Sequence, residues 1–195
     1  MVPVELSESN RAAAAELRAA EFSALRRTIT ARGTARVVVA PLTFAVWATL
    51  TLALVLLSDV PLACVLPLAV LVGGFEAIHA LHVGAERIGR YIQVQYEGDP
   101  EGPQWETAAM TVGPALPGGG VDPLFSAVFL GATLVNGLSA FAVLAQPTLP
   151  ELVVLALLHA AFGFRVIRAR VAAARQRAVE LESFKALLLG QRERR

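Results

Sequence analysis

Apolar and polar positions divide the chain into four long apolar blocks, separated by segments that are polar or rich in helix breakers. The blocks cover residues 37–58, 61–82, 124–145 and 149–168. Each has about 20 residues, which is the length of helix that crosses the roughly 30 Å hydrocarbon layer of a bilayer. The pattern therefore predicts an all-α integral membrane protein with four transmembrane helices.

The connections inside each pair of blocks are short and carry signals for a new helix. Ser58 and Asp59 precede Pro61, which suits the first turn of a helix, and Thr148 with Glu151 forms the Ser/Thr-x-x-Glu pattern of a capping box. Residues 98–122, between the two pairs, are rich in Gly and Pro, and we expect them to form a loop across the inner membrane face. The sequence thus predicts two antiparallel hairpins joined by one long loop.

Two of the predicted helices continue beyond the bilayer. Residues 61–97 begin as an apolar run to Phe75, continue without a clear breaker after it, and would form a rod of roughly 55 Å. The fourth helix continues without a breaker to Gly190. The predicted organisation is a cytoplasmic N-terminal amphipathic helix at residues 1–36, a membrane domain at 37–170 and a cytoplasmic C-terminal helix at 171–195. The membrane domain includes a cytoplasmic helix extension at 83–97 and a loop at 98–122.

The two terminal segments have apolar faces of their own. The N-terminal helix is expected to end at Gly33, and Pro41 to mark a kink or the start of the buried part of the first span. This helix either packs on other cytoplasmic helices or lies at the membrane surface. In the C-terminal helix an approximate 4,3 spacing predicts a seam that packs on the extension of the second helix, formed by Ile167, Val171, Ala174, Ala178, Leu181 and Leu188.

Composition and charge support this topology. The chain has 195 residues, of which 55% are hydrophobic, and its mean hydropathy is +0.58. All 17 basic residues lie in the N-terminal segment, the middle connection or the C-terminal segment, whereas the short turns contain only Asp59 and Glu151. The positive-inside bias predicts that both termini are cytoplasmic. Sixteen of the 17 basic residues are Arg, which favours a GC-rich prokaryotic source and hence its cytoplasmic (inner) membrane.

A polar stripe along residues 61–97 is the strongest candidate for chemistry. It contains Glu76, His79, His82 and Glu86 on one helical face. Counting about 1.5 Å per residue from the outer turns places Glu76 and Arg165 at the same depth. Because an ionisable group in a span is costly without a partner, we expect an ion pair between them.

Other roles for the stripe stay open. Its carboxylates and imidazoles suit a proton relay from the cytoplasm, and Glu76-x-x-His79 is also a metal-binding spacing, although the chain has only one copy. His159 is level with Asn136 and with Trp47 or Thr49, which predicts a second polar layer. Four arginines near the inner surface are candidates for lipid headgroups, namely Arg87, Arg90, Arg168 and Arg170.

Several classes of site have no pattern in the sequence. The Gly118–Gly120 run lacks the Lys-Ser/Thr of a phosphate-binding loop, and the single Cys64 excludes an internal disulfide. The basic segments lack interleaved aromatic residues, so we expect neither nucleic-acid binding nor a cofactor. The leading hypothesis is a non-enzymatic membrane subunit that binds the lipid bilayer and either self-associates or docks a partner membrane subunit. The alternatives are a small proton-coupled transporter or channel component and a metal-dependent membrane enzyme.

Overall fold

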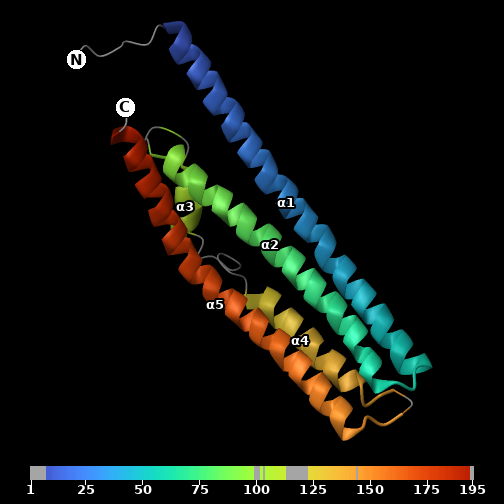
Figure 1. Ribbon diagram of the computed structural model, residues 1–195. Coiled ribbons are helices and arrows are strands. Elements are labelled where there is room, and N and C mark those ends of the chain that lie inside the picture. Colours follow the sequence, from blue (N-terminus) through green and yellow to red (C-terminus); the bar gives the residue numbers. More distant parts are fainter. Residues whose placement is uncertain (1–7, 99–101, 103, 113–122, 144, 194–195) are drawn as a thin grey trace.

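The computed structural model describes residues 8–98, 102, 104–112, 123–143 and 145–193, and every element in them is helical. The hairpin turns lie at one end of the molecule, and the Glu8 end of α1 and the Glu193 end of α5 lie toward the other (Figure 1). The elements in chain order are α1 (Glu8–Leu57), η1 (Pro61–Cys64), α2 (Val65–Gln95), α3 (Trp105–Val112), α4 (Pro123–Ser139) and α5 (Leu149–Glu193).

Side-chain pairs show how the three long helices run against one another. Arg18 of α1 bonds to Gln95 of α2, and Arg36 bonds to His82, so α1 and α2 are antiparallel. In contrast, α2 and α5 run parallel, because partners along them stay about 90 residues apart over the whole contact. The α2 helix is therefore the central rod, with α1 and α5 beside it (Figure 1).

Three helices are long and apolar enough to cross a membrane, within Ser9–Leu57, Pro61–Gln95 and Leu149–Gly190. Many of their large apolar side chains face outward, including Val38, Leu42 and Leu52 of α1 and Leu157 of α5. A soluble domain rarely exposes so large an apolar surface, whereas lipid solvates it well. These helices indicate a membrane protein. The shorter apolar α4 has 17 residues, so four spans remain a prediction.

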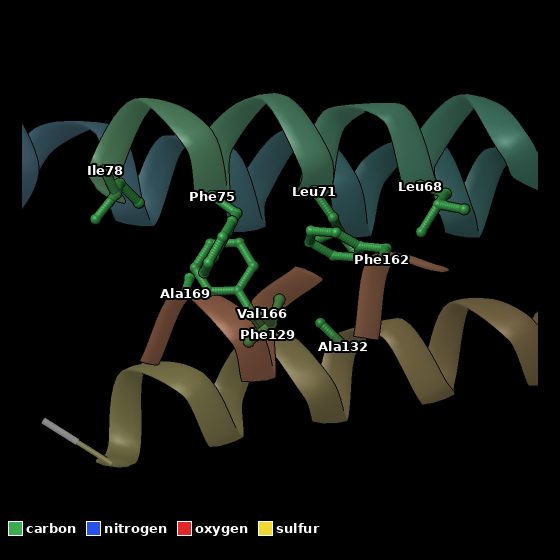
Figure 2. Packing of buried hydrophobic residues seen from close by; sticks show 9 residues of the cluster. All are labelled: Leu68, Leu71, Phe75, Ile78, Phe129, Ala132, Phe162, Val166 and Ala169. Carbon is green, nitrogen blue, oxygen red and sulfur yellow. The ribbon is translucent and has the colours of Figure 1, made fainter. Parts of the chain in front are cut away.

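The core lies where α2, α4 and α5 meet against α1. Figure 2 shows α2 above α4 and α5, with Phe75 at the centre of the cluster. Its ring contacts those of Phe125, Phe129 and Phe162, with centroids 5.3–5.8 Å away. The α2 contribution follows a 3,4,3 spacing, which keeps its members on one helical face. The buried cluster comprises Leu68, Leu71, Phe75, Ile78, Phe129, Ala132, Phe162, Val166 and Ala169.

The first helix corrects the prediction of a break near Gly33. The α1 helix continues through Gly33 and Pro41 for 50 residues. A helical Gly costs only about 1 kcal/mol relative to Ala, and contacts of Arg26 and Arg36 with other elements hold the helix on both sides of it. Pro41 is exposed within the apolar half. Residues 8–36 and residues 37–57 of the first predicted span are thus one rod.

The ends of two other helices also differ from the prediction. The α4 helix ends at Ser139 rather than near residue 145, because Ser139 Oγ donates to the Asn136 carbonyl and the chain then makes tight turns at Phe141 and Ala142. The second rod begins as the short η1 and its α-helix ends at Gln95. The capping box of α5 is confirmed in part, since Glu151 accepts hydrogen bonds from the Thr148 N–H and hydroxyl, both at 2.8 Å.

The expected packing of the C-terminal seam on α2 is wrong for its first residues. Ile167 and Val171 are 52% and 50% exposed, whereas Leu181 and Leu188 are half-buried. The face that α5 turns toward α2 contains Arg177, Glu180 and Phe184, of which Phe184 stacks edge-on with Tyr91. Charged pairs thus contribute to the choice of the α5 face that meets α2, and Ile167 and Val171 are left on the outside. The predicted seam residue Ala174 has no described side chain.

Candidate functional site

The predicted polar stripe of α2 forms a ladder of ion pairs, mostly with α5. Glu76 pairs with Arg165, Glu86 with Arg177, and Arg90 with Glu180. Partners on the two helices advance together because the helices are parallel and each rises by about 1.5 Å per residue. The stripe therefore fixes the register of α5 against α2.

At the end of the ladder away from the hairpin turns the central residue is Arg90, which is only 3% exposed. Its Nε and Nη2 donate to Glu180 Oε2 at 2.8 and 2.5 Å, and Nη1 donates to Glu86 at 3.0 Å. Burial alone would raise the pKa of Glu180, but hydrogen bonds from Arg90, Gln176 and Arg87 outweigh it and lower that pKa. This pairing corrects the headgroup prediction for Arg90, whose guanidinium is enclosed, while Arg87 is exposed and pairs with Glu180.

The membrane end of the ladder is the Glu76–Arg165 pair. Arg165 Nη2 donates to Glu76 Oε2 at 2.7 Å, and the side chains are 41% and 43% exposed. The Arg165 guanidinium also lies 5.6 Å from the centre of the Phe75 ring, within cation–π range. The His79 ring also stacks on the Phe75 ring, parallel to it and with the two ring centroids 5.7 Å apart. The two charges thus neutralise each other beside the aromatic core.

A second polar site surrounds Asn136, which is fully buried. Its amide nitrogen donates to the Cys64 carbonyl and to His159 Nε2, both at 2.9 Å. Its oxygen accepts from Trp47 Nε1 at 3.1 Å and from Thr51 Oγ1 at 3.5 Å. All hydrogen-bonding positions of the amide are occupied, so the side chain joins α1, η1, α4 and α5 at one point.

The protonation of His159 follows from these contacts. His159 Nδ1 lies 2.7 Å from the Leu155 carbonyl, which can only accept, so Nδ1 carries the proton and Nε2 accepts from Asn136. The predicted layer of Asn136, His159 and Trp47 is thus brought together, whereas Thr49 is exposed and Thr51 takes its place. A neutral imidazole with both nitrogens occupied suits helix packing rather than proton transfer.

A cavity of about 390 Å³ lies between α1, α2, α4 and α5, on the side of the core away from the hairpin turns. Its floor is apolar and includes Phe75, Phe125 and Val166, and its polar lining includes His79 and His82. Arg36 and Arg170 also line it, and none of its lining residues is acidic. Arg36 Nη1 donates to His82 Nδ1 at 3.0 Å, because an arginine has no acceptor.

The short α3 helix is docked by a carboxylate that sequence analysis missed. Glu97, 7% exposed, accepts hydrogen bonds from the Glu106 N–H, the Thr107 N–H and the Thr107 hydroxyl, each at 2.7 Å. These contacts satisfy free donors at the positive end of the helix. Burial raises the pKa of Glu106. Arg26 of α1 pairs with this carboxylate at 2.6 Å and opposes the rise in pKa. The only available signal was the lack of a capping residue directly before Trp105.

The part of α1 that is distant from the hairpin turns is held by two tyrosines of the second rod. Tyr91 and Tyr96 donate to the two oxygens of Glu21 at 2.9 and 2.6 Å, and Tyr96 also contacts the Phe22 ring. The bond from Tyr96, then that from Tyr91, lowers the pKa of Glu21. Burial, then the bond to Glu21, raises the pKa of both tyrosines. Of the two predictions for the N-terminal helix, this geometry matches packing on other helices of the chain.

The remaining predicted site residues are not united into one centre. Within the described ranges, no group of three or more His, Cys, Asp and Glu side chains is placed to hold a metal ion. Arg168 is exposed and lies over the Phe164 ring at 5.8 Å. A scan against family models and searches of curated proteins and of solved structures give no match to this chain. The function of this chain is therefore inferred from the geometry of its own side chains.

Proposed function

We propose that this chain is a non-enzymatic integral membrane subunit that self-associates through its cytoplasmic helices. The observation that carries the proposal is an exposed apolar stripe that runs from the end of the fourth predicted span into the α5 extension, formed by Ile167 and Val171 with Ala178 below them. Successive spacings of four and seven residues keep the three on one helical face. Such a regular apolar edge is typical of helix association.

The rest of the cytoplasmic region supports the proposal because it is built as a rigid support for this stripe. Arg90 and Glu180 fix α5 on α2, and Glu21 with Tyr96 fixes α1 on the same rod. A rigid helix loses less conformational entropy on association than a flexible one. We further propose that both termini lie in the cytoplasm of a prokaryotic cell, because the basic residues gather at that end.

The bilayer restricts how two copies can meet. Both copies have the same orientation in the membrane, so a two-fold axis must lie along the membrane normal. Two α5 helices related by this axis run parallel, and equivalent residues face each other. Val171 of one copy should therefore approach Val171 of the other.

Disulfide trapping tests this arrangement. In a Cys64→Ala background, reconstituted in nanodiscs large enough for two copies, Val171→Cys should form covalent dimers under mild oxidation. Leu187→Cys is the matched control, because Leu187 is 60% exposed and lies about 160° around the same helix. Equal trapping at both positions, or a monomeric mass in several mild detergents, would contradict the proposal.

The two alternative functions have less support in this geometry. Glu76 points to Arg165 rather than into the cavity that contains His79 and His82, and Glu86 is engaged by Arg90 and Arg177. A relay from Glu86 to Glu76 would have to break these pairs. The transport hypothesis predicts loss of proton flux in vesicles for Glu76→Gln or His79→Ala, and the metal-enzyme hypothesis predicts a stoichiometric ion by elemental analysis.

A further inference from the structure

The cavity between α1, α2, α4 and α5 is amphiphilic, with its charges gathered toward one end. Arg36, His82 and Arg170 each lie 21 residues from Leu57, Pro61 and Leu149, the helix ends at the hairpin turns. At about 1.5 Å per residue, all three are about 32 Å from those turns. A helix that starts at the outer turns leaves the roughly 30 Å hydrocarbon layer at this depth, which is also the depth of the inner-leaflet headgroups.

The apolar part of the cavity lies closer to the membrane centre. Phe75 is 14 residues from Pro61, or about 21 Å, and Val166 is 17 residues from Leu149, or about 26 Å. Phe125 completes this apolar wall. The cavity thus changes from apolar to cationic in the direction in which an inner-leaflet lipid changes from acyl chain to headgroup.

The two arginines of the cavity differ from five other arginines of the chain, which are held in ion pairs. Arg26, Arg87, Arg90, Arg165 and Arg177 are paired with glutamates. Over the described part of the chain, Arg36 and Arg170 form no ion pair, and Arg36 is oriented by its bond to the His82 imidazole. Their charges are therefore available to an anion, and a guanidinium recognises phosphate by two parallel hydrogen bonds.

We propose that this cavity binds an anionic phospholipid of the inner leaflet, with its phosphate between Arg36 and Arg170 and one acyl chain against Phe75 and Phe125. The volume of about 390 Å³ is at the lower end of ligand-site sizes and suits part of one chain rather than a whole lipid. The proposal does not depend on self-association, because all the lining residues belong to one copy.

The test is a lipid titration followed by native mass spectrometry of the full chain in a neutral detergent. Lysophosphatidylglycerol should bind with one saturable site per chain, and at least tenfold more tightly than lysophosphatidylcholine of the same chain length. Inorganic phosphate at millimolar concentration should not displace it. Equal affinity for the two lipids, or full displacement by phosphate, would overturn the proposal.

Variants then locate the site. The double substitution Arg36→Gln and Arg170→Gln should lower the affinity for lysophosphatidylglycerol at least tenfold, whereas Arg27→Gln with Arg175→Gln, which removes two exposed arginines outside the cavity, should leave it within twofold. Ala173→Leu, which fills the cavity without changing its charge, should weaken binding as well. Equal loss in the control pair, or unchanged binding in both cavity variants, would show that the lipid binds elsewhere.

Discussion

The helices of this chain are held together in two different ways along the length of the molecule. In the apolar half, α2, α4 and α5 meet through aromatic rings around Phe75 and through one fully satisfied amide, Asn136. In the other half, called the cytoplasmic half because the proposed topology places it there, α2 and α5 meet through charged pairs around Arg90. The change occurs at the ion pair of Glu76 and Arg165, because the Arg165 guanidinium lies over the Phe75 ring of the aromatic cluster.

This difference reflects the solvent that each half is built for. Lipid chains are as apolar as Leu, so helices in a bilayer gain little from hiding apolar surface and depend on close packing and interhelical hydrogen bonds. In water, partly buried ion pairs with several hydrogen bonds can fix helix register. Asn136 and Arg90 are thus the corresponding residues of the two halves, and their removal should affect different regions.

The largest expected effect is in the cytoplasmic half. Glu180→Ala removes two hydrogen bonds from the buried Arg90 and leaves it with Glu86 alone. Breaking a buried pair in this way should cost about 3 kcal/mol. Hydrogen exchange in nanodiscs should show faster exchange in α2 beyond Glu86 and in the α5 extension, with the apolar half unchanged. Glu182→Ala, at an exposed position two residues away, should have no measurable effect.

Acid should act on the same half. The folded-state pKa values of Glu180 and Glu21 are lowered from an ordinary value of 4.5, so their stabilisation is complete above that value and is lost as the pH falls through the folded values. Exchange in the cytoplasmic half should therefore increase below about pH 4.5 and before the apolar half opens. Simultaneous opening of both halves would contradict the separation proposed here.

A smaller effect is expected in the apolar half from Asn136→Leu. The substitution leaves Trp47 Nε1 and the Cys64 carbonyl without their partner. The Asn136 amide makes four hydrogen bonds in all, and bonds between membrane helices average about 0.6 kcal/mol each, so the loss should be about 2 kcal/mol. Thermal unfolding in detergent measures it. Thr133→Val is the control, because the buried Thr133 hydroxyl bonds only to Phe129 of its own helix, and it should cost less than half as much.

The sequence predicted contacts well where both partners could be placed by counting from the hairpin turns. Depth counting brought Glu76 to Arg165, and Asn136 to His159 and Trp47, because rise per residue in a helix is constant. It could not assign the rotation of α5 about its own axis. The apolar spacing through Val171 suggested one face, whereas the pairing of Glu180 with Arg90 selects another, and that choice depends on a partner 90 residues away.

Helix ends were also beyond local sequence signals. Gly33 has the properties of a terminator, yet α1 continues through it because contacts on α2 and α3 hold the helix on both sides. Residues 61–97 were expected to form one rod, yet α2 ends at Gln95 and Glu97 instead caps α3 from outside. In both cases a tertiary contact outweighs a preference of about 1 kcal/mol.

One pair of glycines gives the smallest and most direct test of the two halves, since the same substitution should have opposite signs. A Cβ on Gly74, in the apolar half, would overlap the Thr43 side chain and come within 2.8 Å of Thr43 Cβ, which is fixed to the helix. Gly74→Ala should therefore force α1 and α2 apart and cost about 1 kcal/mol after the gain in helix propensity. The double substitution Thr43→Ala with Gly74→Ala should restore most of the loss.

On Gly84, in the cytoplasmic half, the added Cβ would meet the guanidinium of Arg32, the far end of a flexible side chain that can turn into water. Gly84→Ala should therefore leave stability unchanged or raise it by up to about 1 kcal/mol, because Ala is the better helix former. Thermal unfolding of both single variants under one condition makes the comparison. Destabilisation by Gly84→Ala equal to that by Gly74→Ala would show that α1 and α2 are packed with the same tightness in both halves, contrary to the distinction between a close-packed and a charge-paired region.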